Sequence, residues 1–322
     1  MQKKGFNLLK KKIKKASNIY IMGHKGIDLD AFGSAVGIYY YALYLRKTAK
    51  IIIDDKKLES SVKKVVDEFK NSVSIIKSSD ISEGLSKESL LIIVDTNKQY
   101  LLQNSNVLEL FDNILILDHH DVGDTTIAEN KALRFIDTSS SSTCEIITKL
   151  LINDNIIIKP EIATIILSGI VLDTNNFVLK TDSDTYYAAY YLSKCGADSK
   201  KVQYLLKQDI KEYINMQKVI TDVEIIKNIA ITKGLQTQIY RREDLAKIAD
   251  TILLFNNIEA SFVIGKLEDG IGISARSMGT IDVGKFLESF GGGGDNHEAA
   301  TKIVDKSLNE VFSMILKASK KL

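Results

Sequence analysis

The chain alternates short apolar runs with longer stretches in which apolar residues recur every three or four positions. In the first half, strands are expected over residues 18–22, 49–54, 90–95 and 113–118, and helices over 31–45 and 60–70. The runs at 90–95 and 113–118 show no polar alternation, which is typical of strands buried on both faces. This pattern predicts an α/β fold, with a parallel sheet flanked by helices.

The second half has a different pattern. Helices are expected over 160–172, where Pro160 takes a helix-start position that needs no N–H, and over 183–197 and 200–220. From about Val223, strands and turns occupy 223–232, 235–240, 259–267 and 270–278, around a helix at 242–255. We therefore expect a parallel-sheet catalytic domain over 1–195, a helical connector over 196–220 and a smaller mixed α+β domain over 221–322.

Composition agrees with two globular domains. The chain has 322 residues, of which 45% are hydrophobic and 26% charged, as in soluble proteins. The longest apolar runs, 35–45 and 162–172, are too short to span a bilayer, and no signal peptide is recognised, so a cytoplasmic location is expected. A net charge of +2 gives no reason to expect a long nucleic-acid partner.

Two local features have simple interpretations. The lysine-rich segment 1–15 carries Phe6, Leu8, Leu9 and Ile13 between its lysines, so it is either a membrane-surface helix or a solvated amphipathic helix. We favour the second. Cys144 and Cys195 lack the spacing of a disulfide framework or a thiolate metal site, and we expect both to be packing residues.

Carboxylates and imidazoles gather where predicted apolar elements end. Asp28 or Asp30 could simply cap the helix that follows, and Asp95 could begin a turn. However, ligands collect at the carboxyl ends of strands in open parallel sheets, and adjacent histidines after an aspartate are unusual. The candidate set is His24, Asp28, Asp30, Asp95, Asp118, His119, His120 and Asp173.

If these groups converge, their negative charge requires neutralisation, which divalent cations can supply. Carboxylate and imidazole ligands without cysteine favour Mn²⁺, with Mg²⁺, Fe²⁺ or Zn²⁺ as alternatives. About six ligands suit two ions roughly 3.5–4 Å apart, bridged by a carboxylate. Such a pair is typical of phosphoester hydrolysis, which is the reaction we predict.

Four segments carry a family resemblance: GHKGIDLDAFGSA (23–35), IIVDTNK (92–98), ILDHHD (116–121) and GIVLDTNNF (169–177). Their content and order resemble the DHH phosphoesterase superfamily. The stretch ISARSMGTIDVGKFLESFGGGG (273–294) is similar to the DHH-associated substrate-binding domain. Within the superfamily, the amino-acid sequence looks most like the catalytic part of GdpP-type cyclic-di-AMP phosphodiesterases.

The resemblance implies roles for the candidate set. His24, Asp28 and Asp95 would hold a first manganese ion, and Asp95 would bridge to a second. His120 would contact phosphate or support a ligand, and Asp118 would orient a histidine. The implied ligands of the second ion are Asp30, Asp95, His119 and Asp173, and the implied catalytic set is Asp95, Asp118, His119 and His120.

Substrate contacts are also implied. A helix that begins with Ser141, Ser142 and Thr143 would direct its N-terminus and hydroxyls at phosphate. Arg276 would make a forked phosphate contact, and the glycine loop would offer backbone N–H groups. The family's loop reads GGGH, whereas here Asp295 replaces that histidine and His297 follows two positions later. Either His297 reaches the substrate through a shifted loop or that contact is lost, and we expect Asp295 to face a base or ribose. The set is Ser141, Ser142, Thr143, Arg276, Gly292, Gly293, Gly294 and His297.

The expected function is manganese-dependent hydrolysis of cyclic di-AMP to pApA, with AMP as a possible further product. A hydrolase of pApA or other short linear RNA is the alternative. A catalytically inactive nucleotide sensor is a third hypothesis. It would predict a damaged ligand set, yet every implied ligand position holds a residue able to bind metal. The expected partner is a cyclic dinucleotide or short linear nucleotide, and a homodimer is an open alternative.

Overall fold

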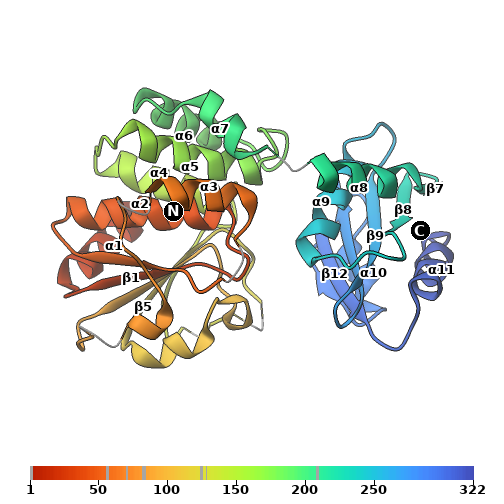
Figure 1. Cartoon of the computed structure of the whole chain (residues 1–322), viewed down its shortest axis with the longest axis horizontal. Helices are drawn as coiled ribbons and strands as arrows, with labels where there is room; N and C mark the ends of the chain where they lie inside the picture. Colours follow the sequence, from red (N-terminus) through yellow and green to blue (C-terminus); the bar gives the residue numbers. More distant parts are fainter. Residues whose placement is uncertain are drawn as a thin grey trace. The chain divides into compact units, whose positions relative to one another are not determined.

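The computed structural model describes residues 3–322 apart from 56–57, 70–71, 82–84, 124–125, 128 and 208–209. The chain divides into two compact units, 1–207 and 208–322, each with its own sheet (Figure 1). This division places α7 (Ser199–Leu205) in the first unit and α8 (Ile210–Thr221) in the second. The two helices of the expected connector therefore belong to different units.

The first unit is built on a six-stranded sheet with the order β3-β2-β1-β4-β5-β6, in which every neighbouring pair is parallel. The chain runs outward from β1 to β3 and then returns to β4 on the other side of β1. The strand order therefore reverses between β1 and β4, the kind of position where α/β proteins bind ligands. The strands are β1 (Ile19–Met22), β2 (Ala49–Ile52), β3 (Ile75–Ile76), β4 (Leu90–Val94), β5 (Asn113–Asp118) and β6 (Leu133–Ile136).

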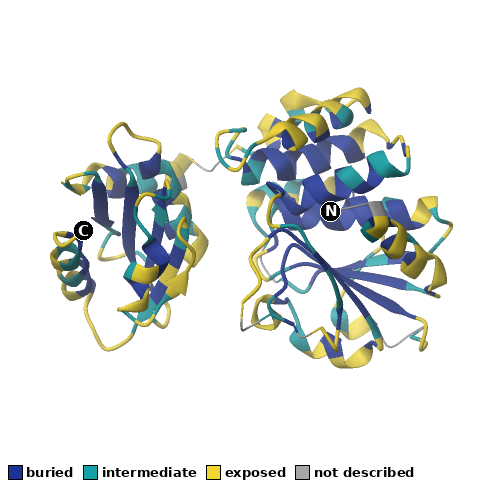
Figure 2. Cartoon of the chain, turned by 180° about the vertical axis from the view of Figure 1, so that it is seen from behind, coloured by how far each residue is buried: buried dark blue, intermediate teal, exposed yellow. Residues whose placement is uncertain are grey.

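Helices cover one face of this sheet, and the main core of the unit lies between the helices and the sheet, where Figure 2 shows both layers coloured as buried. In this layer α2 packs against α4 and α5, and α5 packs against α6 and α7. The other face is covered by the 3₁₀ segment Ser105–Leu110 and by neighbouring loops. Besides α7, the helices of this unit are α1 (Lys3–Lys15), α2 (Leu29–Tyr44), α3 (Ser60–Phe69), α4 (Thr143–Asn153), α5 (Pro160–Asp173) and α6 (Ser183–Lys194). The predicted parallel α/β architecture is confirmed.

The lysine-rich helix α1 packs on the first unit through its apolar side. Phe6, Leu9 and Ile13 are buried in the core, whereas Lys11 and Lys14 are exposed. This agrees with the amphipathic-helix interpretation, because the apolar side already has a protein partner. Along the described parts of the chain, no helix combines the length and apolar character needed to cross a membrane.

The second unit has a mixed sheet with the order β11-β12-β10-β9-β8-β7, in which β8 and β9 are parallel and the other pairs antiparallel. Helices α8 and α9 contribute to the core on one face, and α10 and α11 to the core on the other. Besides α8, the elements are β7 (Glu224–Ile226), β8 (Ile229–Lys233), α9 (Arg242–Leu253), β9 (Ala260–Leu267), β10 (Gly270–Ser277), α10 (Val283–Glu288), β11 (Gly293–Gly294), β12 (Glu298–Ile303) and α11 (Leu308–Ser319). The segment 235–240 is irregular rather than a strand, and the Tyr240 hydroxyl accepts a hydrogen bond from the Leu235 N–H.

Close packing of α5 on α2 depends on Gly169. A Cβ atom added at this position would lie 2.5 Å from the Cys144 Sγ and 2.9 Å from the Asp30 Cα. Because the second atom is backbone, it cannot move aside without shifting the start of α2. The absence of a side chain at position 169 therefore sets how closely these two helices approach.

We predict that Gly169→Ala destabilises the protein by about 1–3 kcal/mol, because overpacking outweighs the roughly 1 kcal/mol by which alanine favours a helix over glycine. The chain contains no tryptophan, so urea unfolding should be followed by circular dichroism. Gly123→Ala is the control, since its added Cβ would meet nothing within 4 Å. Equal stability of the two variants would contradict this packing argument.

Candidate metal centre

Three neighbouring strands deliver the candidate residues to one edge of the first sheet. His24 follows β1, Asp95 follows β4, and Asp118 ends β5 just before His119 and His120. Because β1, β4 and β5 are adjacent and parallel, their carboxyl ends meet where the strand order reverses. The sheet topology therefore brings these side chains together.

Asp95 occupies the centre of the cluster. Its Oδ2 lies 3.4 Å from the His24 Nε2, and its Oδ1 lies 3.5 Å from the His119 Nε2. The residue is almost fully buried and has a left-handed backbone with φ 58°, which aspartate tolerates better than most residues. Each oxygen of this carboxylate thus faces a different histidine, as a bridging ligand requires.

On one side of Asp95 lie His24 and Asp28. The His24 Nδ1 lies 2.8 Å from the Lys25 carbonyl oxygen and donates a hydrogen bond to it, which leaves Nε2 to face the carboxylates. The Asp28 Oδ1 lies 3.7 Å from this Nε2 and also accepts the backbone N–H groups of Asp30 and Ala31. Asp28 therefore caps α2 and faces the cluster at once.

On the other side lie Asp30, His119 and Asp173. The His119 Nε2 is 3.2 Å from the Asp173 Oδ2, and these two residues and Asp30 offer ligand atoms within 4.8 Å of one another. The same Nε2 is buried, and among the described residues it has no hydrogen-bond partner. A buried imidazole nitrogen without a partner, aimed at carboxylates, is well placed to bind a cation.

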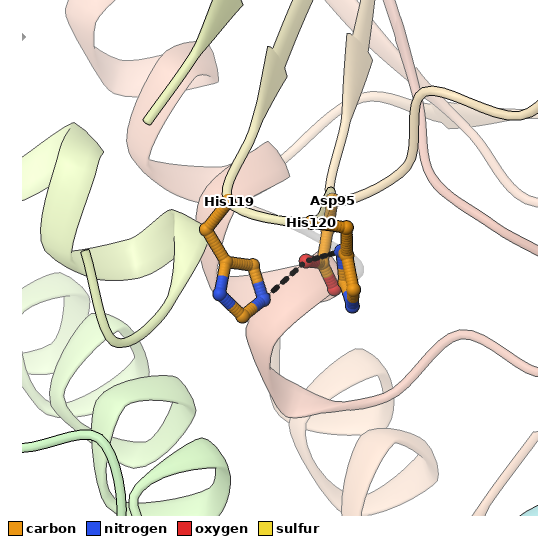
Figure 3. A group of neighbouring side chains, drawn as sticks. All are labelled: Asp95, His119 and His120. Carbon is orange, nitrogen blue, oxygen red and sulfur yellow. Dashed lines mark ion pairs between the residues drawn. The ribbon is translucent and has the colours of Figure 1, made fainter. Parts of the chain in front are cut away.

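His120 and Asp118 are arranged differently. The His120 Nδ1 lies 2.8 Å from the Asp118 Oδ1 and 3.8 Å from the Asp95 Oδ1, as Figure 3 shows for its approach to Asp95. Asp118 is fully buried, and its Oδ1 also accepts the N–H groups of His119 and His120. Asp118 therefore contacts both the ring of His120 and the backbone of the paired histidines, and its role in orienting a metal-binding histidine stays a prediction.

Sequence reasoning did not identify Asn97 as part of this site. Its side-chain amide donates to the Asp118 Oδ2 at 2.6 Å and to the His120 carbonyl oxygen at 3.1 Å. Asn97 is 1% exposed and thereby holds the turn that carries the paired histidines. The available signal was a polar residue two positions after Asp95, which resembles an ordinary turn residue in the sequence.

Charge in this cluster is unbalanced. Burial, together with the charges of Asp95 and Asp173, raises the pKa of Asp30 well above its usual value, and burial with Asp95 and Asp28 does the same for Asp173. Burial lowers the pKa of His120, but Asp118 and Asp95 outweigh it and raise this pKa to about 10. For His24, Asp28 and Asp95 outweigh burial and raise the pKa well above its usual value. The carboxylates thus carry more negative charge than the site can hold without protons or cations.

The residues present fit divalent cations. Three groups can each surround an ion, and they share Asp95 or His119. Imidazole nitrogens and carboxylate oxygens without thiolates are the donor set of Mn²⁺ and similar ions. The partnerless His119 Nε2 and the surplus of carboxylates are both satisfied by such an ion. The groups are His24, Asp28 and Asp95; Asp95, His119 and His120; and Asp30, His119 and Asp173.

Two protein-family profiles match the chain. The profile of the DHH family, N-terminal domain, matches residues 18–170, and that of the DHHA1 domain matches residues 217–321. Together they cover most of the chain in the order expected from the sequence. The protein belongs to the DHH family. We call its first unit the DHH domain and its second unit the DHHA1 domain.

Curated relatives of this DHH protein include several named cyclic-di-AMP phosphodiesterases. The chain is 35% identical to GdpP of Geobacillus thermodenitrificans and 33% identical to PdeA of Listeria monocytogenes, in each case over 96% of its own length. It spans about half, 48%, of either relative. The bifunctional oligoribonuclease and PAP phosphatase NrnA of Mycoplasma genitalium is 28% identical over 95% of both chains.

A solved structure supports the fold. An exopolyphosphatase-related protein from Bacteroides fragilis matches with a TM-score of 0.82, covering 99% of this chain and 97% of its own at 20% identity. The two proteins therefore share a fold.

In the DHH domain, the residues expected to meet phosphate at the start of α4 contact other protein groups. Ser142 caps α4 by accepting the Glu145 N–H, and the Ser141 hydroxyl donates to the Glu145 carboxylate at 2.6 Å. The Thr143 hydroxyl donates to Asp95. All three residues are buried. Their role as substrate contacts stays a prediction, beside these observed contacts within the domain.

In the DHHA1 domain, Arg276 is held by carboxylates. Its Nε donates to the Asp250 Oδ1 at 2.8 Å, and its guanidinium lies 3.5 Å from the Glu298 Oε2. A substrate phosphate would have to share or replace these partners. The forked phosphate contact stays a prediction.

The glycine loop of the DHHA1 domain has a structural reason for its composition. A Cβ on Gly292 would lie 2.4 Å from the Thr301 Cβ, and Gly293 and Gly294 form the edge strand β11, which pairs with β12. The Asp295 Oδ1 accepts the N–H groups of His297 and Glu298, so its carboxylate closes its own turn. The nucleotide contacts expected of Gly292, Gly293, Gly294 and His297 stay predictions.

We predict that the metal-free protein binds Mn²⁺ and that Asp173→Asn weakens binding, because an amide cannot supply the charge that the buried ion requires. Isothermal titration calorimetry should give two equivalents for the original chain and at least a tenfold weaker second equivalent for the variant, since loss of a ligand should cost no less than loss of a supporting group.

The control for this prediction is Glu161→Gln at the opposite end of α5, where the side chain is exposed. This change should leave both equivalents in place. Equal weakening by the two variants would show that the binding sites lie elsewhere.

Proposed function

We propose that this DHH protein is a manganese-dependent phosphodiesterase that hydrolyses cyclic di-AMP to pApA through a two-cation centre. The observation that carries the proposal is the position of Asp95, with one oxygen facing His24 and the other facing His119. The groups beyond these histidines, Asp28 and Asp173, supply further ligand atoms on either side. The proposed ligands are those implied by the sequence: His24, Asp28, Asp30, Asp95, His119 and Asp173.

Two bound divalent cations would neutralise the phosphodiester and lower the pKa of an attacking water. The protein groups prepare for this by orienting their donors in advance. The Lys25 carbonyl directs the His24 Nε2 inward, and the Asp118 carboxylate fixes the His120 ring, which is half exposed at the edge of the cluster. An exposed imidazole held in this way can contact a substrate phosphate or move a proton.

The choice of substrate rests on the relatives. GdpP and PdeA are named cyclic-di-AMP phosphodiesterases, and both match this chain across the DHH and DHHA1 domains. Because the chain spans about half of each relative, only the phosphodiesterase chemistry of the matched part is proposed for this chain. The DHHA1 domain would supply nucleotide contacts, with Arg276 and His297 as the proposed residues.

A second candidate function is hydrolysis of pApA or short linear RNA. It is favoured by the match to NrnA, a named oligoribonuclease that pairs with this chain over 95% of both lengths. An inactive nucleotide sensor would instead be expected to lack ligands, whereas every proposed ligand position here carries a carboxylate or imidazole. The two hydrolase functions differ in substrate and share the same centre.

We predict that Asp95→Asn lowers turnover of cyclic di-AMP by at least about 100-fold, because it removes the charge of the proposed bridge, and loss of merely supporting groups already costs 10–100-fold in metal sites. Asparagine also tolerates the left-handed backbone at this position, so the fold should be kept. Initial rates with Mn²⁺ would be measured by chromatography of the products.

The same assay separates the candidate substrates. Cyclic di-AMP, pApA and a short RNA are compared at equal concentration, and faster cleavage of the linear substrates would favour the second candidate. Asp112→Asn, an exposed change just before β5, is the matched control and should keep full activity. Substantial activity in Asp95→Asn would rule out the bridging role.

A further inference from the structure

Thr143, the first residue of α4, contacts two members of the cluster. Its hydroxyl donates to the Asp95 Oδ1 at 3.0 Å, and its backbone N–H donates to the Asp30 Oδ2 at 2.8 Å. The next residue, Cys144, donates its N–H to the Asp30 Oδ1, also at 2.8 Å. The start of α4 therefore binds two carboxylates of the protein itself.

A buried network holds the start of α4 in place. The Glu145 Oε2 accepts the N–H and hydroxyl of Ser141, at 3.1 and 2.6 Å, and the hydroxyl of Thr185 on α6 at 2.8 Å. The Lys149 Nζ lies 2.6 Å from the Glu145 Oε1 and offsets its charge. Glu145 and Thr143 are both fully buried. Thr143 is thus presented by a rigid helix end whose hydrogen bonds are made within the domain.

We propose that Thr143 is a positioning residue of the metal centre, and that its hydroxyl sets the rotation of the Asp95 carboxylate. The inference rests on the proposed two-cation function. Asp95 must turn one oxygen toward His24 and the other toward His119 to bridge two ions. The Thr143 hydroxyl bonds only the oxygen that faces His119, so it holds the carboxylate in this rotation.

The contact also indicates which ion should be affected. Without the hydroxyl, the Asp95 Oδ1 loses the donor that directs it toward His119, whose Nε2 also faces Asp173. The Asp95 Oδ2 still faces His24. Asp30 keeps its two backbone donors, because they do not depend on the side chain at position 143. Loss of the hydroxyl should therefore weaken the ion on the His119 side and spare the ion on the His24 side.

Thr143→Val tests this inference, because it keeps the shape and the N–H while removing the hydroxyl. Mn²⁺ alone is titrated into the metal-free chain by calorimetry. The second equivalent should bind about 10–100-fold more weakly, as for other outer-shell partners of metal ligands, and the first should be unchanged. At two added equivalents, electron paramagnetic resonance should show isolated rather than coupled Mn²⁺. Thr143→Ser should restore both readouts.

Thr148→Val is a matched control on the same helix. Thr148 is equally buried, but its hydroxyl donates to the Cys144 carbonyl oxygen, away from any cluster carboxylate. It should bind Mn²⁺ as the original chain does. Thr143→Ala provides a second deletion of the hydroxyl should the valine variant fold poorly, as judged by its circular dichroism melt.

The inference is overturned if folded Thr143→Val or Thr143→Ala binds both equivalents normally, or if Thr148→Val weakens them as much. An original chain that binds fewer than two equivalents would remove the premise as well. Hydrolysis is measured separately. If the original chain binds two Mn²⁺ but leaves cyclic di-AMP intact, the proposed function fails while the role of Thr143 stands. Excess Mn²⁺ should restore turnover in Thr143→Val, which a purely structural defect would not allow.

Discussion

The mutual repulsion of crowded carboxylates is the constraint on which this structure depends. Asp30 and Asp95 are buried, Asp28 and Asp173 are partly exposed, and all four meet at one edge of the DHH sheet, where limited access to solvent strengthens the charge interactions between them. Folding alone would avoid such an arrangement, because each unpaired buried charge costs free energy. The fold therefore leaves unbalanced negative charge at the place where its strand order reverses. A bound cation would neutralise it.

The protein offsets part of this cost with neutral donors around the cluster. Asp30 receives two backbone N–H groups from the start of α4, Asp28 receives two from the start of α2, and Asp118 receives two from the paired histidines. Backbone donors stabilise the charged form of a carboxylate without supplying a competing cation. The carboxylates can thus remain oriented while their charge stays available to an ion. The starts of α2 and α4 and the turn after β5 each supply backbone N–H groups to one of these carboxylates.

Much of this could be predicted from the sequence. The apolar runs gave the parallel sheet, since strands buried on both faces leave an unmistakable hydrophobic pattern, and the strand ends then indicated His24, Asp95 and His119 as neighbours. The roles of Asn97, Thr143 and Glu145 could not be predicted in this way. They depend on hydrogen bonds between segments far apart in the chain, and a buried polar residue has no periodic signal.

The second domain was harder to predict. Its mixed sheet pairs β8 with β9 in parallel while the other neighbours are antiparallel, and such pairing depends on long-range register rather than local pattern. The segment 235–240 shows the same difficulty, because its alternating residues could form a strand but instead carry Tyr240 into a side-chain contact with the backbone of Leu235. Arg276 and Asp295 were assigned by family resemblance alone. The sequence offered no sign that both would already be bound by neighbouring protein groups.

The reversal of strand order has a consequence for how the DHH domain assembles. β1 belongs to the part of the chain that forms one side of the sheet and β4 to the part that forms the other, while Asp173 is the last residue of α5. No partly folded form that lacks either half can gather the complete set of ligands. A cation that binds only the finished arrangement stabilises the native state by mass action and leaves incomplete forms unaided. Metal supply would then govern how long this domain survives proteolysis as well as how fast it works.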